Sequence, residues 1–312
     1  MLVCVQLNPT LDRILEVPGF AVGETLRAEQ SVAYPLGKAI SVACAVKTLG
    51  TTPLVVSLIG EKEEETYAQF LHEKQIPCHL VPVNGKTRSN VTIIDPLNVT
   101  TTHIRDRGFT PPPEALNSIN AILQAEVGPE SIVAFSGSLP PQVPENTYAT
   151  LLEKLPPCKA QGLDTSGPAL QAGMGAHPSV VKPNLEELHE LFPDAPDSPD
   201  DVQTLLPFVD RFRETGVAVG AITLGNRGSL LWDSQTVLAS AVEVPRVVDT
   251  VGCGDSFLAG MLVGILRDWD LDQIARVATA AAGANAMTAG AGLFLEEDFK
   301  SLRAKVQIEQ IA

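Results

Sequence analysis

Two rhythms of apolar and polar positions alternate along the chain. Short apolar runs rich in β-branched residues are typical of buried strands, and they occupy residues 2–7, 53–59, 131–136, 161–164, 180–182, 218–223 and 228–232. Apolar residues recur every three or four positions, as in amphipathic helices, over residues 38–49, 63–74, 113–126, 145–155, 185–191, 200–214, 254–266, 271–288 and 296–305. Strands separated by helices pair in parallel. The pattern therefore predicts an α/β fold with a doubly wound, mostly parallel sheet flanked by helices.

Two stretches, 12–35 and 86–107, depart from this rhythm. Both alternate apolar and polar residues, and no helical pattern separates the strands within either of them. We expect them to pair with each other as a small antiparallel sheet outside the main one.

Composition narrows the class of protein. The 312 residues are 45% hydrophobic and 19% charged, a balance that is ordinary for a globular domain. The net charge of −15, from 37 acidic and 22 basic residues, argues against a nucleic-acid partner, because phosphate backbones require a basic face. If the ligand is anionic, locally placed basic side chains or backbone amides must hold it.

Two further features bear on location. No apolar run is long enough to cross a bilayer, and residues 1–5 read as a first strand without the basic region of a signal peptide. The five cysteines are scattered and form no Cys-x-x-Cys pair. We therefore expect a cytoplasmic protein with reduced thiols, no zinc site and no membrane partner.

The first chemical motif is DTVGCGDSF at 249–257. Gly252 and Gly254 allow the backbone to approach a ligand closely, and the helix that follows presents free amides and its positive dipole end. This arrangement suits a phosphate or the charge of a phosphoryl group in transfer. Asp255 could accept a proton from an attacking hydroxyl. The alternative is a glycine turn in which Asp255 only caps the helix.

The second motif, KPNLEEL at 182–188, directly follows a predicted strand. Asn184 and Glu187 lie three positions apart on a starting helix and share one face. Their oxygens could order Mg²⁺ and its waters beside a triphosphate. The alternative is a capping box, in which Asn184 caps the helix and Glu187 reaches back to it.

Three shorter segments carry charge. Gly37 and Lys38 stand at a predicted helix start, where they could hold an anionic group, although the spacing is not that of a Walker A loop. Arg88 could fork onto a phosphate. Asp12 follows the first strand, at the end where open α/β sheets bind ligands. The alternatives are a solvated lysine, a surface arginine and an Asx turn.

The order of the segments is more informative than any one of them. Eight matches are NPTLD at 8–12, GK at 37–38, TRSN at 87–90, SGSLPP at 136–141, LDTSGPAL at 163–170, KPNLEEL at 182–188, TLGNRGSLL at 223–231 and DTVGCGDSF at 249–257. With them the chain resembles the ribokinase-like carbohydrate kinases of the phosphofructokinase-B family, from residue 8 to residue 292. It is most similar to the branch that contains 1-phosphofructokinase and tagatose-6-phosphate kinase.

The resemblance implies a fold and its ligands. One ribokinase-like α/β domain would span residues 1–312, with a small β lid formed by roughly 12–35 and 86–107 that supports a homodimer. ATP and Mg²⁺ are the implied cofactors. The implied nucleotide-binding residues are Lys182, Asn184, Thr223, Gly225, Gly228 and Asn285.

The resemblance also implies catalytic and substrate-binding roles. Asp255 resembles the catalytic base, and the amides of Gly252, Cys253 and Gly254 resemble its anion hole. Asn184 and Glu187 match the element that organises Mg²⁺ through water. The implied ligands of the sugar phosphate are Asp12, Arg27, Gly37, Lys38, Arg88 and Asn90.

The sugar-binding side departs from the family pattern. Residues 36–44 read LGKAISVAC where the family usually reads GGKGINVAR, so the changed positions are Leu36, Ala39, Ser41 and Cys44. Thr92 stands in place of the lysine of the usual TRxNxK, and no acidic residue is evident at 102–104. The catalytic and nucleotide motifs are kept, so the kinase activity is better specified than the sugar.

The resemblance thus implies an ATP-dependent kinase that phosphorylates a hydroxyl of a sugar phosphate. Fructose 1-phosphate is the first expectation, with tagatose 6-phosphate or fructose 6-phosphate next. One alternative is a kinase of an unphosphorylated sugar or nucleoside, against which Lys38 and Arg88 argue because neutral substrates need no such charge. Another is a non-catalytic protein that binds a sugar phosphate or nucleotide, and the intact Asp255 argues against it.

Overall fold

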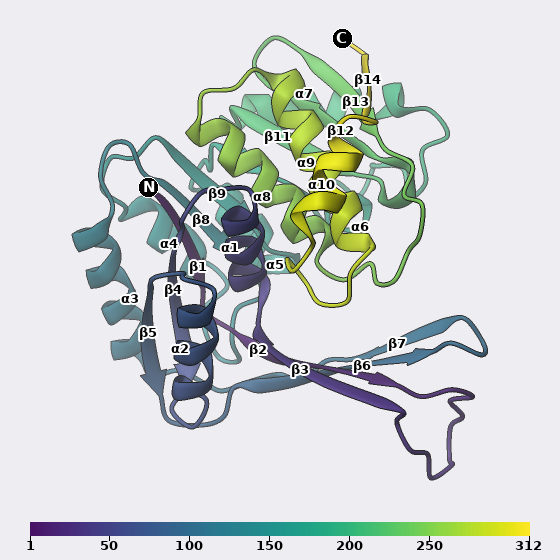
Figure 1. Ribbon diagram of the computed structural model, residues 1–312. Helices are drawn as coiled ribbons and strands as arrows, with labels where there is room; N and C mark the ends of the chain where they lie inside the picture. The colour runs from purple at the N-terminus through teal and green to yellow at the C-terminus, as the bar shows by residue number, and fades with distance from the viewer.

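Ten strands form the main sheet of the computed structural model, which describes all residues 1–312 (Figure 1). Their order is β14-β13-β12-β11-β10-β9-β8-β1-β4-β5. The parallel strands are β1 (Leu2–Gln6), β4 (Leu54–Gly60), β5 (Cys78–Val83), β8 (Ile132–Ser136), β9 (Ala160–Asp164), β10 (Val180–Val181) and β11 (Val219–Thr223). An antiparallel edge consists of β12 (Ser229–Trp232), β13 (Val237–Ala241) and β14 (Gln307–Gln310). The mostly parallel sheet predicted from the sequence is confirmed.

Helices cover both faces of this sheet. One face carries α1 (Lys38–Thr48), α2 (Glu64–Glu73), α8 (Cys253–Leu266), α9 (Leu271–Ala286) and α10 (Glu296–Arg303). The other carries α3 (Pro113–Glu126), α4 (Thr147–Glu153), α5 (Gly167–Met174), α6 (Leu185–Leu191) and α7 (Leu206–Glu214). Strand β1 serves both cores: Leu2 and Cys4 join the first and Val3 and Val5 the second, because successive side chains of a strand point to opposite faces. No helix has the length and apolar character that a membrane crossing requires.

The pattern of apolar positions located most of the helices and strands and missed four of them. All seven predicted strands and all nine predicted helical runs are confirmed, with the run at 200–214 starting as a 3-10 turn. The missed elements are β5, β13, β14 and α5. Strand β14 has the polar sequence QIEQ at the edge of the sheet, and α5 begins at Gly167-Pro168 and has eight residues, so neither shows an apolar period.

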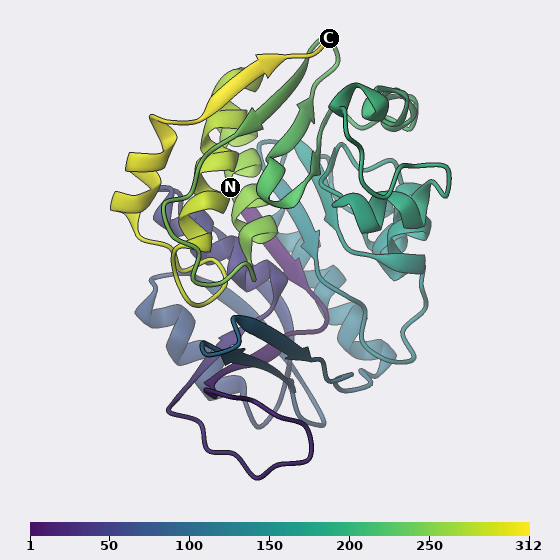
Figure 2. The ribbon, with the colours of Figure 1, turned by 90° about the vertical axis from the view of Figure 1, so that its right-hand side faces the viewer.

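The two irregular stretches form a separate four-stranded sheet, in the order β3-β2-β6-β7. Its strands are β2 (Thr10–Glu16), β3 (Gln30–Leu36), β6 (Arg88–Asp95) and β7 (Thr100–Ile104). Its long hairpins project from the main body (Figure 1), and the turned view shows the connection between β2 and β3 below it (Figure 2). The outer pairs are antiparallel, but β2 and β6 pair in parallel, so the prediction of an antiparallel sheet is wrong for the central pair. Strand β1 precedes β2 and strand β5 precedes β6. Because β1 and β5 both run parallel to β4 in the main sheet, β2 and β6 leave that sheet in the same direction.

Helix α8 packs very closely on α9, and its first turn lies at the carboxyl edge of the main sheet. A side-chain carbon at Gly260 would lie 2.5 Å from the Cα of Ala278, so the contact requires a glycine.

Candidate active site

A cavity of about 810 Å³ opens along the carboxyl edge of the parallel strands. Segments that follow β8, β9, β10 and β11 line one side, the second sheet contributes Asp12, Arg88 and Asn90, and the first turns of α1 and α8 contribute Lys38 and Asp255. This is the edge at which open α/β sheets bind ligands. All predicted site residues line the cavity except Arg27 and Asn285.

The first turn of α8 presents backbone amides to the cavity. Gly252 adopts a left-handed φ of 83°, and a side-chain carbon there would lie 2.4 Å from Ala291, so only glycine fits. The amides of Gly252, Gly254 and Asp255 have no hydrogen-bond partner in the protein, whereas that of Cys253 donates to a turn carbonyl at 3.3 Å. The predicted trio of amides is therefore corrected: Asp255 takes the place of Cys253 among the free donors.

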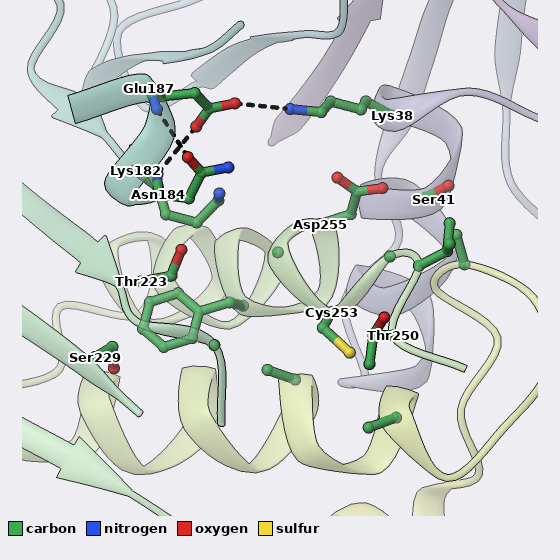
Figure 3. Close-up of a pocket in the computed structure, with 18 of the residues that line it drawn as sticks. Lys38, Ser41, Lys182, Asn184, Glu187, Thr223, Ser229, Thr250, Cys253 and Asp255 are labelled. Carbon is green, nitrogen blue, oxygen red and sulfur yellow. Dashed lines mark hydrogen bonds and ion pairs between the residues drawn. The ribbon is translucent and has the colours of Figure 1, made fainter. Parts of the chain in front are cut away.

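Asp255 is buried in the same turn and faces the cavity (Figure 3). It makes no capping hydrogen bond, so the capping alternative is not what the structure contains. Burial raises the pKa of Asp255 to about 7; Lys38 and Lys182 lower it, and Asp164 and Asp12 raise it. A carboxyl group with a pKa near neutrality can take up and release a proton at the pH of the cell.

Asp164, at the end of β9, joins two lysines. Lys38 Nζ lies 3.4 Å from its Oδ2, and Lys182 Nζ lies 3.4 Å from its Oδ1. Burial alone would raise the pKa of Asp164, but the two ammonium groups bring it below its ordinary value. Burial alone would lower the pKa of Lys38, but the carboxylates of Asp164, Glu187 and Asp255 raise it. The ion pairs thus keep Lys38 and Asp164 charged.

Lys182 also reaches the amide cluster. A side-chain carbon at Gly254 would lie 3.2 Å from Lys182 Nζ. Glycine at this position therefore leaves room for a buried ammonium beside the free amides, and both kinds of donor can contact one anionic group.

Asn184 and Glu187 form a capping box at the start of α6. Asn184 Oδ1 accepts a hydrogen bond from Glu187 N at 2.8 Å, and Glu187 Oε2 accepts one from Asn184 N at 3.0 Å. The capping alternative is therefore real. It leaves Glu187 Oε1 outside the box, 3.8 Å from Lys38 Nζ (Figure 3). Burial and Asp164 raise the pKa of Glu187, and the lysines lower it.

The second sheet places a carboxylate at the far end of the cavity. Asp12 Oδ1 accepts hydrogen bonds from Thr10 Oγ1 and Asn90 Nδ2, each at 3.1 Å. Burial raises the pKa of Asp12, while these hydrogen bonds, Arg105 and Arg88 lower it. The carboxylate is held in place and can accept hydrogen bonds from a polyhydroxyl ligand.

Two arginines lie beside Asp12. Arg88 donates to the carbonyls of Asn8 at 3.0 Å and Pro9 at 3.3 Å, which fixes its guanidinium against the main body. Arg105, directly after β7, makes no hydrogen bond or ion pair and also lines the cavity. Burial lowers the pKa of Arg88, Asp12 raises it, and Arg105 lowers it because the two guanidinium groups repel. An anionic group between them would relieve this repulsion.

The turn before α1 is held by Gln6. Its Oε1 accepts a hydrogen bond from Ala39 N at 3.1 Å, and its Nε2 donates to the carbonyl of Leu36 at 3.4 Å. Gly37 has a φ of 115°, and a side-chain carbon there would lie 2.5 Å from Gln6 Oε1. The turn therefore directs Lys38 into the cavity.

The remaining part of the cavity combines glycine turns with an apolar wall. Thr223 ends β11, and the turn that follows contains Gly225 and Gly228 at φ values of 64° and 94°. The wall is made of Val242, Val244, Val247, Phe257, Ala282 and Ala286. Such a slot suits a planar base, and exposed backbone in a glycine turn suits phosphates.

Two predicted site residues lie elsewhere. Arg27 is exposed on the connection between β2 and β3, outside the cavity. Asn285 is fully buried on α9 and does not line the cavity, and its amide bonds to the loop before α8, so it is not among the residues that a nucleotide in the cavity could contact.

Sequence reasoning missed Asp164, Arg105 and Gln6. A signal existed for Asp164, which lies in the LDTSGPAL match at the end of a predicted strand. For Arg105 and Gln6 no local pattern exists, because their roles depend on neighbours 17 and about 33 positions away.

Comparisons with known proteins agree with this geometry. The pfkB family carbohydrate kinase model matches residues 2–298. A 1-phosphofructokinase of Bacillus subtilis is 30% identical over 315 residues, covering 100% of both chains, and one of Rhodobacter capsulatus is 31% identical over 289 residues, covering 88% of this chain and 87% of the relative. The structure of Escherichia coli phosphofructokinase-2 in complex with substrates and products is similar with a TM-score of 0.87 at 25% identity, covering 96% of this chain and 98% of the other.

Proposed function

This chain belongs to the pfkB family of carbohydrate kinases, and we propose that it transfers the terminal phosphoryl group of ATP to a hydroxyl of fructose 1-phosphate. The family and the two named relatives make it an ATP-dependent kinase of a sugar phosphate. The observation that supports a phosphorylated acceptor is the pair Arg88 and Arg105, two cationic groups without a carboxylate ion pair at the cavity end away from α8. A neutral sugar or nucleoside would leave this pair unused.

In the proposed reaction, the acceptor hydroxyl gives its proton to Asp255 while its oxygen attacks the terminal phosphorus of ATP. The bond from that phosphorus to the bridging oxygen breaks, and ADP leaves. The free amides of Gly252, Gly254 and Asp255 would donate to the oxygens of the moving group. Lys182 adds a positive charge beside them.

Mg²⁺ fits this site through water. No group of three His, Cys, Asp or Glu side chains gathers in the chain to hold an ion directly. Glu187 Oε1 is free of the capping box, so Asn184 and Glu187 would hold the ion by way of its waters. When bound, the ion supplies charge compensation on the phosphates of ATP.

A coupled assay of ADP release tests this function. We expect turnover with fructose 1-phosphate above tagatose 6-phosphate and fructose 6-phosphate, and none with free sugars or nucleosides. Asp255→Asn should lower kcat by about 10²- to 10⁴-fold while MgATP binding is kept, and Asp200→Asn, an exposed loop change, should leave kcat unchanged. Turnover of neutral acceptors alone would favour the kinase of an unphosphorylated substrate instead.

We further propose that the second sheet, within 12–35 and 86–107 of a single domain spanning 1–312, is a lid and the face of a homodimer. Six of the ten exposed large hydrophobic side chains lie on its strands or on the connections between them: Val22, Leu26, Val32, Leu97, Val99 and Ile104. Exposed apolar side chains gathered on one element are typical of an interface. The five free cysteines support a reducing compartment such as the cytoplasm.

A further inference from the structure

Asn285 uses every hydrogen-bonding position of its side-chain amide. Nδ2 donates to the carbonyl of Val251 at 2.8 Å and to Cys253 Sγ at 3.7 Å. Oδ1 accepts from Gly292 N at 2.7 Å and from Ser256 Oγ at 3.1 Å. A carbonyl can only accept and a backbone amide can only donate, so this orientation of the amide is the one that satisfies both Val251 and Gly292.

These bonds surround the turn that carries the free amides. Val251 precedes Gly252, and Ser256 follows Asp255, so Asn285 holds both ends of the Gly252–Asp255 segment. It holds the facing loop as well, through Gly292. A side-chain carbon at Gly252 would lie 2.4 Å from Ala291, the neighbour of Gly292, so the loop lies directly against the turn. One buried side chain therefore ties α9, the turn before α8, the first turn of α8 and the loop at 290–292.

We infer that Asn285 is a positioning residue for phosphoryl transfer, one that fixes the free amides of the Gly252–Asp255 turn and the Asp255 carboxylate relative to the transferring group. The inference rests on the proposed function. Asn285 itself is fully buried and does not line the cavity, so it acts through the turn and not on the substrate.

The expected effect is on rate more than on binding. Donors that stabilise charge in the transition state must already be in place, and displacement of a reacting group by about 1 Å costs roughly 100-fold in rate. The contacts proposed for the sugar phosphate and for the base of the nucleotide lie outside the Gly252–Asp255 turn. They are on the second sheet, α1, the turns after β10 and β11, and the apolar wall, which includes Phe257 of α8 and Ala282 and Ala286 of α9. Loosening the turn should therefore lower kcat and leave both KM values nearly unchanged.

The test compares three variants of the full chain. Asn285→Leu keeps the branching of the side chain and removes all four hydrogen bonds. Ser256→Ala removes one of these hydrogen bonds, and it tests the same inference if Asn285→Leu does not fold. Ile274→Val trims a buried side chain near the other end of the same helix, and it controls for a simple loss of stability.

We expect kcat to fall about 10- to 100-fold in Asn285→Leu and less in Ser256→Ala, with both KM values within about threefold of wild type. Ile274→Val should keep the kcat of wild type even if its melting temperature falls as far as that of Asn285→Leu. A second readout needs no turnover: calorimetric titration of MgADP with and without nitrate, a planar anion shaped like a phosphoryl group in transfer. Nitrate should tighten MgADP binding in wild type and in Ile274→Val, but not in Asn285→Leu.

Two failures are distinguishable. If wild type phosphorylates no sugar phosphate, the proposed function is wrong, and the nitrate titration still reports on the turn. If wild type is active and folded Asn285 or Ser256 variants keep both its kcat and its nitrate effect, the positioning role is overturned while the function stands.

Discussion

Lys38 and Lys182 share the buried carboxylate of Asp164, and the carboxylates of Glu187 and Asp255 stand beside them. Three carboxylates outnumber two ammonium groups, so one charge is uncompensated. The excess negative charge does not affect the three carboxylates equally. The pKa of Asp164 is lowered, whereas the pKa values of Glu187 and Asp255 are raised. Asp255 is therefore the carboxylate best able to accept a proton near pH 7.

The pH dependence of the rate follows from this cluster. Asp255 must be ionised to act as a base, so kcat/KM of wild type should fall about tenfold per pH unit below its pKa of about 7. Four groups face Asp255, namely Lys38, Lys182, Asp164 and Asp12. Because Asp164 raises the pKa of Asp255, Asp164→Asn should shift the acid limb to lower pH, while kcat falls as the lysines lose their anchor.

The measurement is a pH–rate profile of both proteins with the same substrates. Titration of the substrate phosphates is then common to both profiles and cancels in the comparison. Asp210→Asn, at the surface of α7, should leave the limb in place. A limb that stays fixed or moves to higher pH in Asp164→Asn contradicts the assignment.

The metal proposal can be separated from the capping box. In Glu187→Gln the side-chain oxygen can still accept the hydrogen bond from Asn184 N, so the helix start is kept, but the charge is lost. We expect the Mg²⁺ concentration for half-maximal rate to rise about 10-fold, since changes in outer-shell groups typically weaken metal binding by that factor or more. The matched control is Glu190→Gln on the same helix, outside the cavity. Equal Mg²⁺ titrations for wild type and Glu187→Gln would leave only the capping role.

Residues in short motifs could be predicted from the sequence because their partners are close in the chain. Asn184 and Glu187 are three positions apart, and Gly252 and Asp255 form one turn. Asn285 could not be interpreted in this way, because its partners lie on two other stretches of the chain, 251–256 and the loop at Gly292. A polar residue in a helical pattern looks the same whether it faces a ligand or a buried loop.

At the scale of elements, two departures from the family pattern meet in the second sheet. Thr92 on β6 and His103 on β7 lie directly opposite each other, and Thr92 Oγ1 is 3.1 Å from His103 Nδ1. Ser41, another departure, donates its hydroxyl to the carbonyl of Gly37 at 3.1 Å within α1. The polar groups of these residues therefore have hydrogen-bond partners within the second sheet and at the start of α1. The sequence could show that they differ, but only the pairing of strands shows that Thr92 and His103 are partners.

The second sheet makes a testable contribution to substrate binding. Arg105→Ala removes a cation that has no partner in the chain, so the fold should be unaffected, while KM for fructose 1-phosphate should rise about 10- to 100-fold at about 1.4 kcal/mol per decade. KM for ATP should stay near its wild-type value. Arg107→Ala, two positions further and outside the cavity, is the control. A rise in both KM values, or in neither, would rule out a specific contact with the sugar phosphate.

The contact between α8 and α9 should be sensitive to a single methyl group. In Gly260→Ala the new carbon would meet the backbone of Ala278 at 2.5 Å, so one helix must shift. Overpacking of this kind costs about 1–3 kcal/mol in unfolding free energy. The shift would also move the first turn of α8, so kcat should fall as well.

Gly128→Ala is the matched control, because nothing lies within 4 Å of the added carbon and its φ is not left-handed. Denaturant unfolding and kcat, measured on both variants, decide the matter. If Gly260→Ala is as stable and as active as Gly128→Ala, the contact between α8 and α9 does not position the Gly252–Asp255 turn.

For the whole molecule, the alternation of strands and helices was enough to predict the main sheet and the edge at which ligands bind. It could not predict how the second sheet attaches. The parallel pairing of β2 with β6 depends on the direction in which β1 and β5 leave the main sheet, which no local pattern records. The site is built from both sheets. The sequence could therefore predict which residues of the second sheet bind the sugar phosphate, but not how they are arranged around the cavity.

The same second sheet exposes an apolar surface that a monomer would leave in water. Val32 on β3 is 43% exposed, and its side chain lies on the same face of the sheet as that of Ile14, the residue of β2 paired with it. Burying such side chains contributes roughly 25 cal/mol per Å² of apolar area. A second copy of the chain would cover this face and hold the two sheets beside the two cavities.

Sedimentation velocity tests this assembly. Wild type should sediment with twice the mass of one chain, and Val32→Glu should shift towards the monomer, because a charge at the buried face must be desolvated. The unfolding free energy of the monomer should change by no more than about 0.5 kcal/mol, since Val32 is exposed within one chain. Leu295→Glu, an exposed apolar position outside the second sheet, should leave the mass unchanged. If wild type sediments as a monomer at all concentrations, or if Val32→Glu dimerises as well as Leu295→Glu, the dimer does not form through this sheet.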